Sequence, residues 1–290
     1  MISRLELPKV LLQEKLSEFL KEDAGMGDVT AEAIAPPGLI TKAQIIAKEN
    51  CVVAGLSEVE LLFKMLDVKV IKSVNDGDEV KQGRVVAEIV GEGRTILTAE
   101  RTALNILTRM SGIATTTRML LKLVKRHRQD LRIAATRKTA PGLRYFDKKA
   151  VEIGGGDPHR YRLDDAVLIK DNHIAVAGGV EEAIERARSA TSFTKKIEVE
   201  VKKPEEALKT ARLEVDIIMF DNMTPMEVKE SIEILKKSGL RDKVLIEVSG
   251  GVTEENITEY AETEPDIISI GALTHSVKSV DMSLEIVKTD

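Results

Sequence analysis

The stretch KIEVEVKKPEEALKTARLEVDIIMFDNMTPMEVKE, residues 196–230, decides the fold class of this chain. It contains two short apolar runs, and a helix-start signal follows each of them. Pro204 suits the first position of a helix, and Thr224 with Glu227 three residues later forms a capping box. Strands that alternate with capped helices predict βα units and a parallel sheet.

The same alternation continues on both sides of this stretch, and Thr253 is placed to cap a further helix. About six or seven strands over about 145 residues suit a compact or incomplete α/β barrel, because a closed eightfold barrel needs about 250 residues. A doubly wound open sheet is the alternative, but residues 154–156 (GGG) do not match a dinucleotide-binding fingerprint. The strand candidates are residues 132–135, 166–169, 196–201, 216–220, 244–248 and 266–270.

The N-terminal third has a different pattern. Between residues 41 and 94, short alternating runs are separated by turn signals, which predicts antiparallel strands in a mixed α and β unit. Within it, residues 57–66 have a helical pattern. We also expect an amphipathic helix over the first twenty residues, ended by the glycines at 25 and 27. The residues that share its apolar face are Leu12, Leu16, Phe19 and Leu20.

A helical region links the two patterns. Thr98 is a good N-cap with Glu100 in the first turn, so we expect a helix from Thr98 to about Met110. Ser111-Gly112 should loosen it before a second helical run that ends near Arg128.

Composition excludes several classes of protein. A net charge of −5 argues against a nucleic-acid binder, and 3% aromatic residues leave few platforms for stacking bases. The single cysteine, Cys51, excludes an internal disulfide framework, and its alternating context predicts a buried hydrophobe and not a nucleophile. Charges interrupt every apolar run, so we expect no signal peptide and no membrane span. These features predict a cytoplasmic protein, in a bacterial or archaeal cytosol by default.

Polar or small residues follow the predicted parallel strands, where α/β folds place their active sites. Because loops are hydrophilic in general, the informative feature is that paired charges stand next to glycines. The residues at these ends are Arg137, Lys138, Lys170, Asp171, Asn172, His173, Glu198, Glu200, Asp221, Asn222, Ser249, Gly250, Gly251, Gly271, Ala272 and His275.

Clustered cations in a net-acidic chain predict an anionic ligand, since arginine binds carboxylate and phosphate bidentately. Solvated surface cations are the alternative, which we expect for Lys148 and Lys149 in the exposed-looking residues 146–150 but not for Lys170, which follows an apolar run. The clustered cations are Arg137, Lys138, Arg144, Arg160, Arg162 and Lys170.

The acids suggest a second component of the site. Glu198 and Glu200 share one strand face, and Asp221 ends the next strand. Such carboxylates suit Mg²⁺ or Mn²⁺, contacts with ribose hydroxyls, or ion pairs with the cations. A pure zinc site is not expected, because the four histidines lack short ligand spacing.

Glycines at two strand ends predict contacts with a phosphate group. Ser249-Gly250-Gly251 and Gly271-Ala272 stand where the last two loops of a barrel bind phosphate, although tight βα turns also favour glycine.

Taken together, the longer motifs resemble the quinolinate phosphoribosyltransferase family (nicotinate-nucleotide pyrophosphorylase, carboxylating). The similarity runs in order from residues 28–30 (DVT) to the C-terminus. In one departure, Ala135 stands where many members carry an acid, so no role of that acid carries over. The motifs are residues 100–105 (ERTALN), 111–115 (SGIAT), 136–139 (TRKT), 141–142 (PG), 154–156 (GGG), 159–160 (HR), 168–173 (LIKDNH), 220–222 (FDN), 249–251 (SGG) and 271–276 (GALTHS).

The resemblance implies a two-domain subunit. An N-terminal α/β sandwich would comprise residues 1–111, to which the tail 276–290 returns, and an open (incomplete) α/β barrel would comprise residues 112–275. It also implies a homodimer or a dimer-based larger assembly with shared active sites, in which Arg101 reaches the partner's pocket. The reaction would join quinolinate to 5-phosphoribosyl 1-pyrophosphate, giving nicotinate mononucleotide, pyrophosphate and carbon dioxide on the route to NAD.

The roles that the resemblance implies match the chemistry of the residues. Catalysis would rest on Lys138, Lys170, Glu200 and Asp221. Glu200 and Asp221 would hold Mg²⁺, for which Mn²⁺ substitutes, directly or through water. Quinolinate would be bound by Arg101, Arg137, His159, Arg160 and Lys170. Phosphoribosyl pyrophosphate would be bound by Lys138, Glu200, Asp221, Ser249, Gly250, Gly251, Gly271, Ala272 and His275.

Two alternatives remain, one on the same scaffold and one from another class of protein. A paralogue on the same scaffold could be nicotinate-specific or of the type found in molybdenum transport operons, but a monocarboxylate needs fewer cations than this chain supplies. A non-catalytic phosphate or nucleotide sensor would keep Ser249-Gly250-Gly251 but has no reason to keep Glu200 and Asp221 as well.

Overall fold

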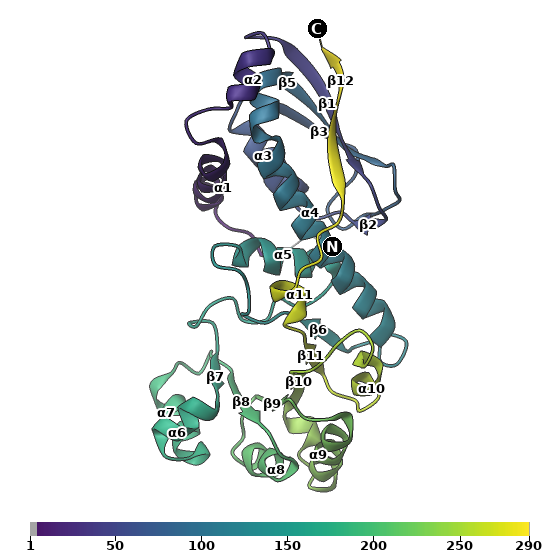
Figure 1. The fold of residues 1–290 in the computed structure, drawn as a ribbon. Helices are drawn as coiled ribbons and strands as arrows, with labels where there is room; N and C mark the ends of the chain where they lie inside the picture. Colours follow the sequence, from purple (N-terminus) through teal and green to yellow (C-terminus); the bar gives the residue numbers. More distant parts are fainter. Residues whose placement is uncertain (1–4, 290) are drawn as a thin grey trace. The chain divides into compact units, whose positions relative to one another are not determined.

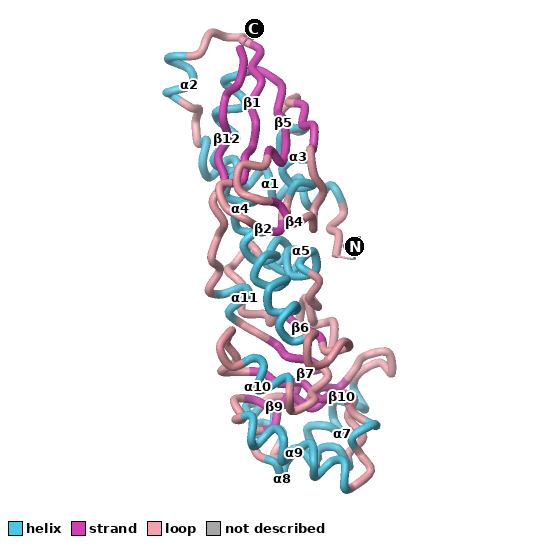
Figure 2. Tube along the Cα trace, turned by 90° about the vertical axis from the view of Figure 1, so that its right-hand side faces the viewer, coloured by secondary structure: helices cyan, strands magenta, loops and turns pink. Residues whose placement is uncertain are grey.

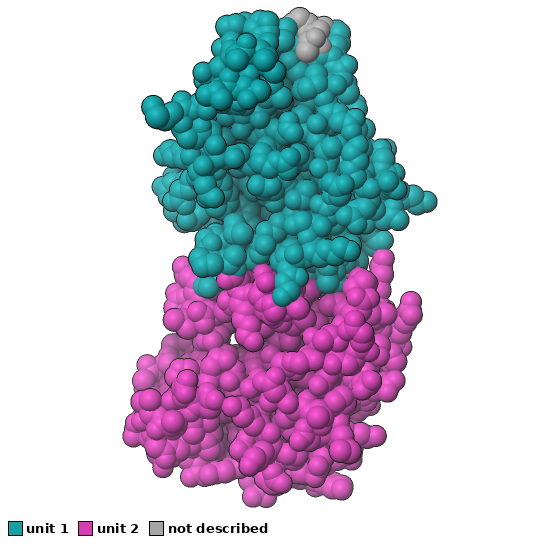
Figure 3. Space-filling view, in the orientation of Figure 1, with its two compact units in different colours: residues 1–118, 140–155, 276–290 teal, residues 119–139, 156–275 magenta. Residues whose placement is uncertain are grey.

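The computed structural model describes residues 5–289 of the chain. It consists of two compact units, which Figure 3 distinguishes by colour. Unit 1 contains residues 1–118, 140–155 and 276–290, and unit 2 contains residues 119–139 and 156–275. The expected domains differ from these units at residues 112–118 and 140–155, and the domain boundary itself stays a prediction.

Unit 1 is built on an antiparallel sheet of four strands in the order β12-β1-β5-β3 (Figure 1). The C-terminal strand β12 pairs with β1 along its length, so the end of the chain completes the N-terminal sheet. Burial alternates along β1, where Ala43, Ile45 and Ala47 point into the core. The strands are β1 (Ile40–Ala47), β3 (Lys69–Lys72), β5 (Val85–Glu92) and β12 (Met282–Thr289), with a separate pair β2 (Cys51–Val52) and β4 (Glu79–Val80).

The N-terminal part of unit 1 contains the helices α1 (Lys9–Ala24), α2 (Val29–Ile34) and α3 (Leu56–Lys64). The predicted start of the N-terminal helix was wrong. The helix α1 begins at Lys9, directly after Pro8, and not at the start of the chain. The part of that prediction that concerns residues 1–4 lies outside the described residues. Leu12 and Leu16 are buried on its apolar face, as expected.

Cys51 is buried in unit 1, as the alternating pattern predicted. Burial, together with the nearby Glu49 carboxylate, raises the pKa of its thiol to about 11. The thiol therefore stays protonated at neutral pH, which is the state of a packing residue and not of a nucleophile.

One helix, α4 (Gly93–Val124), replaces the two that were predicted. Thr98 is not an N-cap, because it lies inside the helix and its hydroxyl donates to the carbonyl of Arg94. Ser111 and Gly112 do not loosen the helix. The Ser111 hydroxyl bonds the backbone of Ala54, and a Cβ on Gly112 would lie 2.1 Å from the backbone oxygen of Lys278. These two small residues serve close packing against other segments.

The helix α5 (Arg144–Gly154) overturns the expectation that Lys148 and Lys149 are solvated. Residues 145–154 are all buried, and Lys148 is completely so. Lys149 Nζ lies 2.7 Å from Glu58 Oε1 and 3.2 Å from the Tyr145 hydroxyl. Burial alone would lower the pKa of Lys149, but Glu58 raises it above its usual range. The charge of Lys149 is buried because it meets an opposite charge from a distant part of the chain.

Asp147, another charged residue of α5, is also buried together with an opposite charge. Its fully buried carboxylate accepts two hydrogen bonds, of 2.8 and 3.0 Å, from the guanidinium of Arg109 on α4. A bidentate contact of this kind is the arrangement that best compensates a buried carboxylate.

Unit 2 contains a six-stranded sheet in the order β6-β11-β10-β9-β8-β7, in which every pair is parallel. The edge strands β6 and β7 do not pair with each other within the described residues, so the arrangement is open, which confirms the predicted α/β class. The strands are β6 (Arg132–Ala134), β7 (Val167–Ile169), β8 (Ile197–Val201), β9 (Ile217–Asp221), β10 (Leu245–Ser249) and β11 (Ile267–Ser269).

Helices that connect these strands cover one face of the sheet (Figures 1 and 2). Two helix starts are confirmed: Pro204 begins α8, and Thr224 with Glu227 forms the capping box of α9. Thr253 is not a cap, because α10 begins four residues later with Asn256 at its N-cap position. The helices are α6 (Asp171–Ala177), α7 (Val180–Ala190), α8 (Pro204–Arg212), α9 (Pro225–Lys237), α10 (Ile257–Ala261) and α11 (Ala272–His275), with a 3₁₀ turn at Arg241–Lys243.

Within the described part of the chain, none of the helices combines the length and the apolar character that crossing a membrane requires.

The buried pair Lys149–Glu58 gives a test of this fold. Lys149→Met leaves the Glu58 carboxylate buried without its cation, so we expect the free energy of unfolding to fall by about 3–5 kcal/mol. The double variant Lys149→Met/Glu58→Leu should lose clearly less, since no uncompensated charge remains. Urea denaturation measures both. Lys15→Met, which breaks the exposed pair with Glu18, is the control and should have little effect. Equal losses in the single and the double variant would contradict this account.

Candidate active site

A cavity of about 260 Å³ lies at the carboxyl edge of the parallel sheet in unit 2. All six strands contribute to it through their last residues or the loops that follow, because the carboxyl ends of parallel strands meet at one edge. Eight residues that the sequence predicted for the site line it: Arg137, Lys138, His159, Arg160, Lys170, Glu200, Asp221 and Ser249. The remaining lining residues are Ala135, Thr136, Leu168, Met219, Glu247 and Ser269.

The two arginines of this cavity repel each other. Burial and the nearby charge of Arg137 lower the pKa of Arg160 below its usual range. The Nε atom of Arg137 is buried and has no hydrogen-bond partner among the described residues. A buried guanidinium nitrogen that lacks an acceptor, beside a second guanidinium, is a site for an anion such as a carboxylate or phosphate.

Three other predicted cations lie elsewhere. Arg162 is exposed and bonds Asp164 at 3.0 and 3.1 Å, so it is not part of the cavity. Arg144 begins α5 in unit 1, and Arg101 is exposed on α4, also in unit 1. Of the predicted cluster, Arg137, Lys138, Arg160 and Lys170 are therefore the cations that line the cavity.

Two carboxylates stand among these cations. Lys170 forms an ion pair with Glu200, whose side chain is only 10% exposed. The carboxylate of Asp221, at the end of β9, makes no hydrogen bond within residues 5–289. Glu200 and Asp221 thus offer hard oxygen ligands in one cavity, which is the donor set that Mg²⁺ and Mn²⁺ prefer. The residues present fit a divalent cation at this place.

Small residues form the adjoining part of the cavity edge. Gly250 and Gly251 have positive φ angles of 90° and 68°, and a Cβ on Gly250 would lie 2.4 Å from Asn222 Oδ1. Next to Gly251 there is open space. A Cβ on Gly271 would lie 3.0 Å from the ring of His275 and 3.3 Å from Lys138 Cδ. The loop after β10 therefore approaches the loop after β9 so closely that only glycine fits at position 250, and the loop after β11 lies against the loop after β6 at Gly271.

The close approach at Gly271 places the cation Lys138 beside a glycine-containing loop. The hydroxyl of Thr274 donates to the backbone carbonyl of Lys138 at 2.9 Å, which fixes the loop after β6 against α11. Ala272 begins that short helix, and His275 ends it. Backbone N–H groups at small residues, with Lys138 nearby, suit the oxygens of a phosphate or pyrophosphate group.

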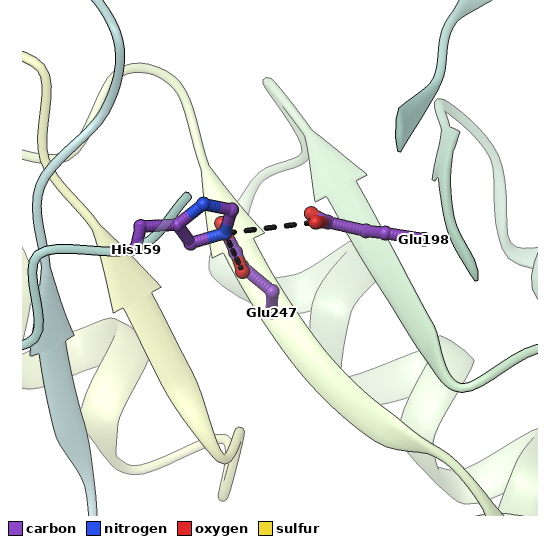
Figure 4. Close-up of side chains that lie close together, drawn as sticks. All are labelled: His159, Glu198 and Glu247. Carbon is purple, nitrogen blue, oxygen red and sulfur yellow. Dashed lines mark hydrogen bonds and ion pairs between the residues drawn. The ribbon is translucent and has the colours of Figure 1, made fainter. Parts of the chain in front are cut away.

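The His159 cluster, which comprises His159, Glu198, Glu247 and Ser269, forms a buried polar group beside the cavity. His159 Nε2 lies 3.1 Å from Glu247 Oε2 and 3.6 Å from Glu198 Oε2 (Figure 4). The Ser269 hydroxyl donates to Glu247 Oε1 at 2.5 Å. Burial and the Glu247 carboxylate raise the pKa of Glu198 to about 8.

Two members of this cluster, Glu247 and Ser269, were not predicted as functional residues. The signal was present in the sequence, because Glu247 is the one acid in the apolar run VLIEV at residues 244–248. The ligand atoms of His159, Glu198 and Glu247 all lie within 4.8 Å of one another, a spacing that a metal ion could bridge. We interpret the group as a hydrogen-bonded cluster, since Ser269 and His159 each occupy one oxygen of Glu247.

Comparisons with known proteins cover almost the whole chain. Residues 28–111 match the family model of the quinolinate phosphoribosyl transferase N-terminal domain, and residues 113–285 match that of its C-terminal domain. A probable nicotinate-nucleotide pyrophosphorylase (carboxylating) from Methanocaldococcus jannaschii is 50% identical over 275 residues, which is 94% of this chain and 96% of that protein. The protein of the same name from Methanothermobacter thermautotrophicus is 44% identical over 275 residues, covering 95% and 99% of the two chains.

The fold agrees with a solved structure of the same kind. The nicotinate-nucleotide pyrophosphorylase from Francisella tularensis superposes with a TM-score of 0.90 at 35% identity, over 99% of this chain and 100% of that one.

The pKa of Glu198 gives a test of the buried cluster. Between its ordinary value of 4.5 and its folded value of about 8, the folded state keeps a proton that the unfolded state has lost. The contribution of this group to stability is therefore present at low pH and falls as the pH rises through this window. Thermal midpoints measured from about pH 5 to 8 should fall less in Glu198→Gln than in the native protein. Glu18→Gln, an exposed control, should keep the native slope, and an unchanged slope in Glu198→Gln would refute the assignment.

Proposed function

Because the chain belongs to the quinolinate phosphoribosyltransferase family, we propose that the cavity at the carboxyl edge of unit 2 is its active site. The enzyme transfers the phosphoribosyl group of 5-phosphoribosyl 1-pyrophosphate to quinolinate with decarboxylation, and its product is nicotinate mononucleotide for NAD biosynthesis. One observation carries the assignment of the site: eight predicted residues line the same cavity, six of them predicted from the ends of separate strands.

Quinolinate carries two adjacent carboxylates, which match the surplus of cations in the cavity. Arg137, Arg160 and Lys170 supply that charge, and His159 lies in the same wall. The unpartnered Nε of Arg137 supports this assignment, because a substrate carboxylate would satisfy it. These contacts would hold the ring nitrogen of quinolinate against the anomeric carbon, which lowers the barrier by proximity and orientation.

Phosphoribosyl pyrophosphate would lie along the glycine edge of the cavity. We assign Lys138 to the pyrophosphate, because it approaches Gly271 and lines the cavity. The glycine-containing loops after β10 and β11 would bind the 5-phosphate. The residues assigned to that phosphate are Ser249, Gly250, Gly251, Gly271, Ala272 and His275.

Glu200 and Asp221 would hold Mg²⁺, or Mn²⁺ in its place, directly or through water, and the ion would supply charge neutralisation at the pyrophosphate. The same two carboxylates face the region where positive charge develops on the ribose as its bond to pyrophosphate breaks. Lys170, paired with Glu200, would keep this carboxylate in place while contacting quinolinate.

The chemistry then needs few proton transfers. The lone pair of the ring nitrogen forms the new bond to the anomeric carbon, and pyrophosphate leaves with the electrons of the bond that breaks. The nitrogen becomes positively charged, so the ring stabilises the electron pair left when the neighbouring carboxylate departs as carbon dioxide. That ring carbon finally takes up a proton. The residues of the chain bind, orient and compensate charge throughout.

We further propose that the enzyme is a homodimer, or a dimer-based larger assembly, with shared active sites. Arg101 supports this proposal, because it is exposed in its own subunit although the residues that follow it, 102–104, are buried. In the assembly, Arg101 of the partner subunit would complete the clamp on the two carboxylates. We also propose a cytoplasmic location, which fits a chain whose one cysteine is a buried thiol.

Substrate choice tests the assigned reaction. Purified enzyme with magnesium and phosphoribosyl pyrophosphate should consume quinolinate and release carbon dioxide, while nicotinate should not replace it, since one carboxylate leaves cavity cations unpaired. Release of labelled carbon dioxide and formation of nicotinate mononucleotide by chromatography measure the reaction. Efficient turnover of nicotinate without turnover of quinolinate would contradict the assignment.

Complementation tests the shared site. Arg101→Ala should leave the fold and the dimer intact but weaken quinolinate binding by about 2–5 kcal/mol, the cost of losing a buried charge contact. Mixing Arg101→Ala with Lys170→Ala should form hybrid dimers in which one site carries both changes and the other neither, so activity should partly return. Arg126→Ala, another exposed arginine, is the control and should remain active. No recovery despite demonstrated subunit exchange would mean that each subunit has its own complete site.

A further inference from the structure

The His159 cluster contains two buried residues, Glu247 and Ser269, to which the reaction described above gives no role. Resting on the proposed function, we propose that Glu247, held by Ser269, is a positioning residue that fixes the ring of His159 for binding a carboxylate of quinolinate. The substrate would touch His159 and not Glu247.

The backbone already restricts where His159 can lie. Its φ angle is 53°, in the left-handed region that residues other than glycine rarely adopt. Its N–H donates to Asp157 Oδ1 at 2.8 Å, which stabilises this conformation. A strained residue of this kind persists only where its surroundings enforce it, and such residues concentrate at functional sites. The position of the ring is therefore imposed by the fold.

The orientation of the ring depends on Glu247. Its carboxylate, on the inner strand β10, is fully buried, and its two oxygens have separate partners. Oε1 accepts from the Ser269 hydroxyl at 2.5 Å, and Oε2 lies 3.1 Å from His159 Nε2. Since Ser269 holds one oxygen from the neighbouring strand β11, the other can point only toward the ring. A carboxylate that accepts from one ring nitrogen fixes the orientation of a histidine and stabilises its imidazolium form, in which the other nitrogen also carries a proton that it can donate to a substrate carboxylate.

The second acid strengthens the same arrangement. Glu198 approaches from β8, so His159 Nε2 faces acids from two strands that flank β9 (Figure 4). On β9, between these strands, Met219 lies opposite Glu247 and Glu200 and lines the cavity. The Glu247 carboxylate, at the wall of an anion-binding cavity, would repel a dicarboxylate unless a cationic or hydrogen-bond-donating group screened it. His159 occupies that screening position, and it shares the cavity wall with Arg160.

The first experiment compares two substitutions of Glu247. Glu247→Met removes the acceptor, so the dissociation constant and the KM for quinolinate should rise about tenfold or more, the usual effect of losing the group that orients a functional histidine. Glu247→Gln keeps an oxygen for Nε2 while the Ser269 hydroxyl rotates to accept from the amide, so it should restore most of the affinity. The KM for phosphoribosyl pyrophosphate should change less than about twofold, because the glycine loops do not depend on this ring.

A smaller change covers the case in which Glu247→Met does not fold. Ser269→Ala removes only the hydroxyl that holds Glu247 and should weaken quinolinate binding in the same direction. Ser231→Ala is the matched control, since Ser231 is equally buried but bonds a carbonyl within α9. The control should keep native values for both substrates. Unchanged quinolinate binding in Ser269→Ala, with a native thermal midpoint, would overturn the proposal.

A double-substitution cycle separates positioning from a general structural role. If Glu247 acts through His159, then Glu247→Met and Ser269→Ala should cost nothing further in a His159→Ala background. Additive losses, or equal rises in KM for both substrates, would overturn the proposal. Calorimetric binding of quinolinate is measured independently of turnover. A native enzyme that binds quinolinate without converting it would contradict the proposed function, whereas equal binding by native enzyme and Glu247→Met would contradict the positioning role.

Discussion

The site depends on the balance of charge at the carboxyl edge of the parallel sheet. Arg137, Arg160 and Lys170 are brought together there, and each would repel the others without the acids placed among them. Glu200 pairs with Lys170, but the buried Nε of Arg137 has no acceptor among the described residues. The cavity is therefore short of negative charge in the absence of substrate, and a dicarboxylate is the ligand that corrects the imbalance.

This arrangement requires strained backbone conformations, and the packing of the sheet must compensate their free energy. His159 and Asn222 both adopt left-handed conformations beside the cavity, and Gly250 is so close to Asn222 that no side chain fits. Such positions store conformational strain and are tolerated where packing determines them. The inner strands of unit 2 supply that packing: Val199, Ile218 and Ile246 are completely buried. Rigid strands thus hold irregular, polar loop residues in place.

Local signals predicted many of the features that depend on near neighbours in sequence, although the helix caps expected at Thr98 and Thr253 were wrong. The parallel strands, the helix start at Pro204 and the capping box of Thr224 depend on adjacent residues, and the structure confirms them. Features decided by distant partners could not be predicted in this way. Lys149 is buried because Glu58, 91 positions earlier, meets it, and the α4 helix continues through Ser111-Gly112 because other segments pack there. Most residues of the cavity wall were predicted from strand ends, whereas Glu247 lies inside strand β10 and was not predicted, although it lines the cavity and contacts His159.

A crystal structure of the enzyme with bound quinolinate tests the central claim most directly. The account predicts that both carboxylates lie within hydrogen-bond distance of the cavity cations, with Arg137 Nε satisfied and His159 in contact with one carboxylate. It also predicts that the loop of Ser249, Gly250 and Gly251 stays free for the phosphate of the second substrate. Quinolinate bound outside this cavity, or with its carboxylates on the glycine loop and Arg137 still unpaired, would contradict the account.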